Sequence, residues 1–80
     1  MRIILTNHAR LRAAERGITF EEIVSAILDP DDSQIQDNGI FCFKKSWKEN
    51  ILLVYSKDEK WDWVVITVLR TSKIKKYWIR

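Results

Sequence analysis

The chain has 80 residues, of which 46% are hydrophobic and 31% are charged, a composition typical of a small folded domain rather than a disordered segment. No apolar run approaches the roughly 18 residues of a transmembrane helix, and residues 1–5 are too few for the apolar region of a signal peptide. We therefore expect one domain, residues 1–80, without a membrane partner. Because a single cysteine excludes an intrachain disulfide, we expect this domain in the reducing cytoplasm.

The net charge of +3 is distributed unevenly along the chain. Residues 1–40 carry four arginines against seven acidic residues, a net charge of −3, whereas residues 41–80 carry ten basic residues against four acidic ones, a net charge of +6. The last eleven residues contain five of these cations and no acid. This asymmetry indicates a polyanion such as RNA, or an acidic protein, as the partner.

Residues 7–16 predict a first helix. Thr6 or Asn7 can cap its start, and Gly17 is the usual residue for the left-handed turn that ends a helix. Its apolar residues are scattered around the helical wheel, so this helix has no clean packing stripe.

A second helix follows with a stronger pattern. Thr19 and Glu22 have the spacing of a capping box, and Asp29-Pro30 stops the helix because the residue before proline avoids the helical region. Between these signals the apolar residues recur at helical spacing, at Phe20, Ile23, Val24, Ile27 and Leu28.

Beyond residue 33 the apolar period changes to that of strands. The predicted strands cover residues 34–36, 40–47, 51–55 and 61–69. Asn38-Gly39 is the residue pair of a tight type I′ hairpin turn, and the other connections are short and polar. These features predict an α+β fold, in which two N-terminal helices pack on a four-stranded antiparallel sheet. The tail 71–80 can add a last helical turn.

The last predicted strand is apolar on both faces. One face carries Val64, Ile66 and Val68, and the other carries Trp61, Trp63, Val65 and Leu69. Because the helices can cover only one face, the other must pack on the tail, on a ligand or on a second subunit. We therefore expect a homodimer through the aromatic face of the sheet, although packing within the core is the more usual role of tryptophans in strands.

His8 is the only histidine, and Arg12 and Arg16 follow it at four-residue steps, which places all three on one face of the first helix. An imidazole is the usual proton shuttle at neutral pH, and guanidinium groups suit bidentate contacts with phosphate. The alternative is structural: His8 bonds to nearby backbone, and the arginines pair with Glu15, Glu22 or an acid of the 29–32 loop. If Arg16 is structural, His8 and Arg12 should still face solvent.

The C-terminal tail combines cations with aromatic residues. It can bind an RNA backbone while Tyr77 or Trp78 stacks on a base, or it can be a solvated basic terminus. Cys42 alternates with aromatic residues in a predicted strand and is expected to be a buried, inert thiol. The chain has no glycine-rich phosphate loop and no spacing of residues that fits zinc or calcium, so an enzyme of this sequence would work without metal or cofactor.

Several of these segments together resemble a family of small prokaryotic proteins grouped with the RelE-like and BrnT-like toxins of toxin–antitoxin systems. The segments are His8-Ala9, Arg12, Arg16-Gly17-Ile18, Phe20-Glu21-Glu22-Ile23, Leu28-Asp29-Pro30, Val65-Ile66-Thr67-Val68 and Ser72-Lys73-Ile74-Lys75-Lys76-Tyr77. The resemblance implies a RelE-like fold and a metal-independent endoribonuclease of the mRNA interferase type, held in check by an antitoxin protein. Such toxins activate a ribose 2′-hydroxyl and stabilise the phosphorane that follows.

On this hypothesis each candidate residue has a role. His8 is the general base or acid, Arg12 and Arg70 stabilise charge in the transition state, and Tyr77 stacks or donates a proton. The residues that position the RNA are Arg16, Lys73, Lys75, Lys76 and Trp78. The alternative function is a non-catalytic module of the same fold that binds nucleic acid or protein.

Overall fold

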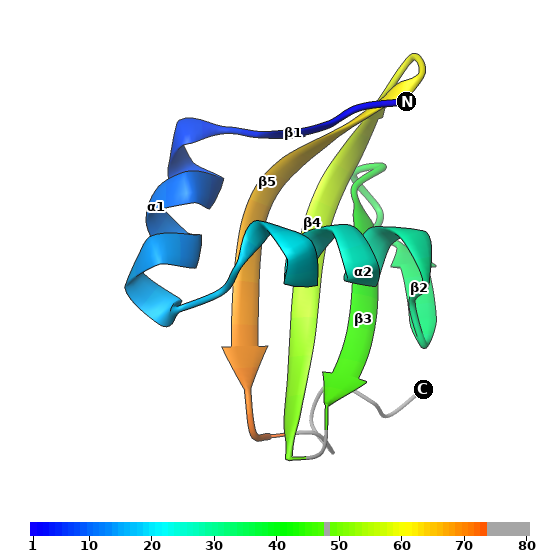
Figure 1. The fold of residues 1–80 in the computed structure, drawn as a ribbon. Coiled ribbons are helices and arrows are strands. Elements are labelled where there is room, and N and C mark those ends of the chain that lie inside the picture. Colours follow the sequence, from blue (N-terminus) through cyan, green and yellow to red (C-terminus); the bar gives the residue numbers. More distant parts are fainter. Residues whose placement is uncertain (48, 74–80) are drawn as a thin grey trace.

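Two helices lie on one face of a five-stranded mixed sheet in the computed structural model, which describes residues 1–47 and 49–73 (Figure 1). In chain order the elements are β1 (Ile3–Leu5), α1 (Asn7–Arg16), α2 (Phe20–Leu28), β2 (Asp32–Ile35), β3 (Phe41–Trp47), β4 (Asn50–Glu59) and β5 (Asp62–Thr71). The strand order across the sheet is β1-β5-β4-β3-β2. The predicted last helical turn falls almost entirely on residues 74–80, which lie outside the described residues.

The predicted four-stranded antiparallel sheet is wrong, because β1 is a fifth strand and pairs in parallel with β5. Ile3 lies opposite Trp63 and Leu5 lies opposite Val65. The backbone N–H of Trp63 donates to the carbonyl of Arg2 at 2.9 Å, and the N–H of Thr6 donates to Val65 at 3.1 Å. Three residues are too few to show an alternating pattern, and their partner lies about 60 residues along the chain, so no local signal reveals β1.

Both helices are confirmed at their predicted ends, because capping is local chemistry. The hydroxyl of Thr6 accepts a hydrogen bond from the N–H of Ala9, and Gly17 ends α1 with a positive φ of 64°. The capping box of Thr19 and Glu22 is present in both directions at the start of α2. Asp29 ends α2 immediately before the proline.

The loop between β2 and β3 is wider than the predicted type I′ turn. Such a turn needs positive φ at both central residues, but Gly39 has a φ of 81° whereas Asn38 does not have a positive φ. The N–H of Gly39 donates to the carbonyl of Gln36, and the N–H of Gln36 donates to the carbonyl of Ile40, so these bonds close over three residues, 37–39. The side chain of Asn38 instead accepts a hydrogen bond from the N–H of Ile40.

A β-bulge changes which side chains of β5 face the helices. Tyr55 of β4 lies opposite Thr67, but the next residue, Ser56, lies opposite Val65, so Ile66 is an extra residue in β5. The alternation reverses at this point, and Val65 and Val68 both lie in the core. The prediction from simple alternation, which placed these two valines on opposite faces, is therefore wrong.

The core lies between the helices and the sheet, and the aromatic residues belong to it. Phe41 and Phe43 pack edge-to-face on Trp63, with ring centroids 4.9 and 5.0 Å away, and Trp63 contacts the buried core. Trp61 lies in the turn between β4 and β5 and is 86% exposed. The aromatic residues of the last strand thus do not share a separate face of the sheet, and the homodimer through such a face stays a prediction.

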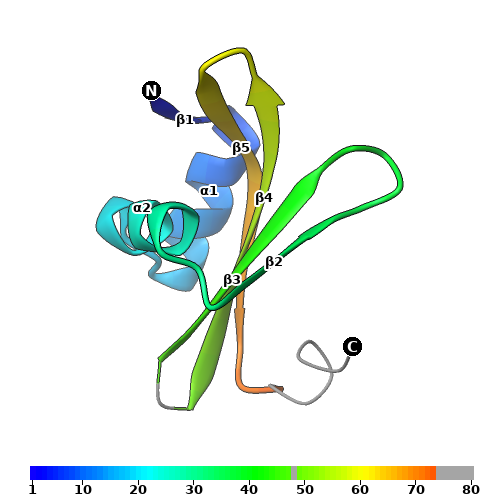
Figure 2. The same cartoon turned by 90° about the vertical axis from the view of Figure 1, so that its right-hand side faces the viewer.

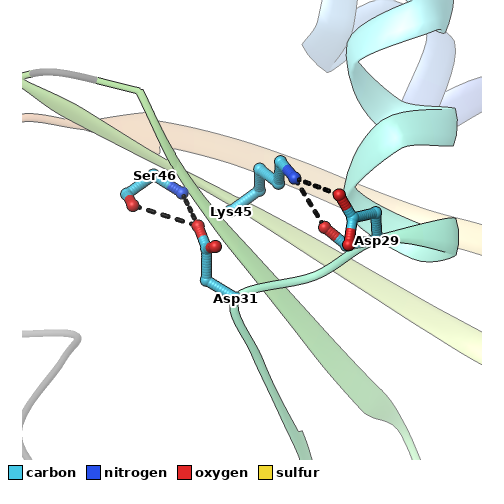
Figure 3. Close-up of polar contacts among 4 residues, drawn as sticks. All are labelled: Asp29, Asp31, Lys45 and Ser46. Atoms are coloured by element: carbon cyan, nitrogen blue, oxygen red, sulfur yellow. Dashed lines mark hydrogen bonds and ion pairs between the residues drawn. The ribbon is translucent and has the colours of Figure 1, made fainter.

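Two acidic residues fix the connection between α2 and β2 onto β3 (Figure 3). The ammonium of Lys45 donates to the carbonyl and the carboxylate of Asp29, at 2.7 and 3.0 Å. The carboxylate of Asp31 accepts hydrogen bonds from the N–H and the hydroxyl of Ser46, at 2.8 and 3.0 Å, and these bonds lower the pKa of Asp31. Asp29 and Asp31 therefore hold this loop against β3 and do not form a free acidic site.

Neither of the helices in the described residues is long and apolar enough to cross a membrane.

Candidate nucleic-acid site on α1

Helix α1 lies beside β5, on the side of that strand away from β4 (Figure 1). β1 pairs with β5 only at residues 63–65, and beyond that point α1 lies along the edge of β5. The hydroxyl of Thr6 donates to the carbonyl of Ile66 at 3.2 Å, and the guanidinium of Arg16 donates to the carbonyl of Val68 at 2.7 Å. Ala9 and Ala13 form the buried side of the helix. Small residues on this side let the helix approach the strand closely.

His8 lies in the first turn of α1 and is exposed to solvent. Among the described residues it has no hydrogen-bond or ion-pair partner. Arg12 follows one turn later, so the two side chains share a flank of the helix. The side chain of Arg12 is 39% exposed, and its guanidinium pairs with the carboxylate of Glu15 at 3.0 Å. This flank presents an imidazole and a guanidinium to solvent with one acid beside them.

Arg16 has the structural role that one interpretation of the sequence gave it. Its hydrogen bond to Val68 ties the last turn of α1 to β5. The pairing with an acid that the alternative interpretation proposed is found for Arg12 and Glu15, not for Arg16.

Arg70 lies on β5 and contacts the other helix, α2. Its guanidinium forms an ion pair with the carboxylate of Glu22, whose other oxygen accepts the N–H of Thr19 in the capping box. The hydrogen bond from the N–H of Thr19 is the main cause that lowers the pKa of Glu22; burial raises it by less, and Arg70 lowers it further. In the described residues no hydrogen bond or ion pair joins Arg70 to His8 or Arg12. Of the predicted catalytic residues that the structure describes, His8 and Arg12 thus lie on α1, whereas Arg70 lies on β5 and is paired with α2.

Of the predicted RNA-positioning residues in the tail, the structure describes only Lys73, which is exposed and whose N–H donates to the hydroxyl of Thr71 at 3.1 Å. The others, together with the predicted proton donor, lie outside the described residues: Lys75, Lys76, Tyr77 and Trp78. In the part of the chain that the structure describes, no pocket is found and no group of acidic, histidine or cysteine residues could hold a metal ion.

A polar group on the opposite face of the sheet was missed by the sequence analysis. Lys44 is only 5% exposed, and its ammonium donates to the side chain of Gln34 at 3.2 Å. Cys42, on the same face, is buried as expected, and burial raises the pKa of its thiol. A lysine in a strand is normally assigned to solvent, so no signal in the sequence indicates that this one is buried.

The architecture defines the protein as a small α+β domain with two helices on one sheet face. It belongs to the family described as a domain of unknown function, DUF4258, whose model matches residues 5–70. The matched segment includes His8, Arg12, Arg16 and Arg70 and ends before Lys73. Neither a curated protein nor a solved structure matches the chain.

The contrast between Arg16 and Arg12 predicts different effects on stability. Arg16→Ala should lower the free energy of unfolding by about 1 kcal/mol, because it removes a charged hydrogen bond to the β5 backbone. Arg12→Ala should lower it by less than about 0.5 kcal/mol, since its ion pair is exposed. Urea denaturation of both variants measures the difference, and an equal loss in the two would contradict the structural role of Arg16.

The lowered pKa of Glu22 predicts a stability difference that depends on pH. Glu22→Gln keeps a capping side chain but loses the charge, and should cost about 1 kcal/mol at neutral pH once solvent screening is allowed for. The folded pKa lies below the ordinary value of 4.5, so the contribution of the carboxylate is complete well above that pH and is lost as the pH falls through the folded pKa. Denaturation of wild type and variant across this range should show their stabilities converging in acid. A difference that persists there would show that the charge is not its cause.

Proposed function

We propose that this protein is a metal-independent endoribonuclease, a toxin of a toxin–antitoxin system, that cleaves RNA by attack of a ribose 2′-hydroxyl. The site is the flank of α1 that carries His8 and Arg12. The observation that carries the proposal is the state of His8, which is exposed and has no partner among the described residues, one helical turn from a partly exposed guanidinium. A histidine that served only to cap or brace the helix would be bonded to it.

The chemistry requires one proton acceptor and one cationic group. The neutral imidazole of His8 takes the proton of the 2′-hydroxyl, and the oxygen forms a bond to the adjacent phosphorus. The bond from phosphorus to the 5′-oxygen then breaks, and that oxygen takes a proton from water or from Tyr77. The products are a 2′,3′-cyclic phosphate and a 5′-hydroxyl. Arg12 donates to the non-bridging oxygens, where negative charge develops in the transition state.

Further support comes from the sequence. The resemblance to RelE-like and BrnT-like toxins rests on segments that include both residues, and it supplies the toxin role and the expectation of an antitoxin partner. Residues 70–80 carry five cations and no acid, and this charge attracts a polyanion.

Cleavage of a labelled RNA by the purified protein in EDTA tests the proposal. His8→Ala should reduce the rate by about 10²-fold or more, the usual contribution of a general acid or base. Arg12→Ala should reduce it by about tenfold to a hundredfold, because the lost donor acts mainly on the transition state. In a bacterial host, expression of the wild type should arrest growth and His8→Ala should relieve the arrest.

Arg10→Ala is the matched control for Arg12→Ala. It removes the same type of side chain from the same helix, but residues two apart point to different sides of a helix. The control should cleave at a rate close to that of the wild type. Equal cleavage by all four proteins would indicate a contaminating nuclease and would remove the support for a site on α1.

The second candidate function is RNA binding without cleavage. Two of the predicted catalytic cations already have acidic partners, because Arg12 pairs with Glu15 and Arg70 pairs with Glu22. These pairs favour a role without catalysis. It predicts saturable binding without product, with an affinity that falls steeply as salt is added because phosphate contacts release counterions. A titration of fluorescent RNA at several salt concentrations measures this slope. Binding that is insensitive to salt would point to a protein partner instead.

A further inference from the structure

The two edges of the sheet differ in how they are protected. On one edge β1 is only three residues long, and α1 binds the carbonyls of β5 beyond it through Thr6 and Arg16. β2 forms the other edge, and no described strand lies on its outer side. Figure 2 looks onto this edge, and β2 lies in front. An open edge is a template for a further strand.

The hydrogen-bond register shows which backbone groups of β2 face outward. The N–H of Gln36 donates to the carbonyl of Ile40, and β2 pairs with β3 without a shift from Asp32 to Ile35. In an antiparallel ladder, successive residues point their N–H and C=O groups alternately toward and away from the partner. Counting back from Gln36, those of Ser33 and Ile35 point away from β3.

This edge also lacks the usual features that prevent pairing. Edge strands are commonly protected by lysine, by proline or by a bulge. Residues 33–36 (Ser-Gln-Ile-Gln) contain no charge and no proline, and the pairing of β2 with β3 has no register shift between Asp32 and Ile35. Ser33 and Ile35 are exposed, and Ile35 is 66% exposed although it is apolar.

We propose that β2 pairs with β2 of a second copy of this chain, to give a continuous ten-stranded sheet. Antiparallel pairing about a two-fold axis at Gln34 places Ser33 opposite the partner's Ile35, and places Gln34 opposite its own copy. Each outward N–H then meets an outward carbonyl, which gives four hydrogen bonds across the interface. This register makes the strand complementary to itself, which is why a second copy is the occupant that fits it. The interface differs from the aromatic face that the sequence suggested.

Acidic residues limit the pairing at both ends of the strand. Asp32 and Asp37 flank the uncharged segment 33–36, and the two-fold axis places Asp31 opposite the Asp37 of the second copy. The pairing therefore extends over residues 32–36 only, and the dimer is expected to be weak. Association is best measured at about 0.15 M salt, where the Debye length is about 8 Å.

Ser33→Pro tests the interface directly. It removes an N–H that points away from β3, so the ladder between β2 and β3 loses no bond, whereas the dimer loses two of its four. Sedimentation velocity from about 10 μM to about 1 mM should show the wild type approaching twice the monomer mass of 9.6 kDa. The dissociation constant should rise by about tenfold or more in Ser33→Pro and stay within about twofold in the control Ser33→Ala, which keeps the N–H.

Ile35→Lys provides an independent variant that leaves the backbone donors in place. It opposes pairing by adding a charge to the edge, and the dimer should again weaken by about tenfold or more. Circular dichroism checks that both variants are folded, and Ile35→Lys decides if Ser33→Pro is not. A wild type that stays monomeric up to about 1 mM, or a folded variant that dimerises as well as the wild type, would overturn the proposal.

Discussion

Strand β5 is the element on which the positions of both helices depend. It pairs with β1 on one side and β4 on the other, and its carbonyls bind the side chains of Thr6 and Arg16 at the two ends of α1. Near its end Arg70 binds Glu22 in the first turn of α2. Alanines on the buried side of α1 offer little apolar area, so hydrogen bonds to this strand do much of the positioning of that helix.

The arginines of the candidate site differ in what they contact. Arg16 and Arg70 hold helices to the sheet, and Arg12 is shared with a neighbouring acid on its own helix. Of the candidate residues on α1, only His8 has no side-chain partner among the described residues. An open helix flank suits contacts with phosphate and ribose better than enclosure of a base, so the proposed ribonuclease is expected to read little sequence through this flank.

The contacts of α1 also make the two edges of the sheet different. Side chains of α1 occupy the edge of β5 that β1 does not reach, whereas β2 ends the sheet with an uncharged segment and an exposed isoleucine. The candidate site and the open edge therefore lie at opposite sides of the sheet (Figure 1). Pairing through β2 would leave the flank of His8 and Arg12 accessible in both copies.

The sequence by itself determined the two helices and their ends, because Thr6, Gly17 and the capping box of Thr19 and Glu22 act within a few residues of one another. It also brought His8 and Arg12 onto one flank, since helical spacing alone does so. Only the tertiary structure decided the parallel strand β1, the bulge at Ile66 and the partners of Arg16 and Arg70. The pairing of β1 and the contacts of the two arginines join residues about 50 to 60 positions apart, and the bulge depends on how β4 pairs with β5, so no local period or cap encodes them.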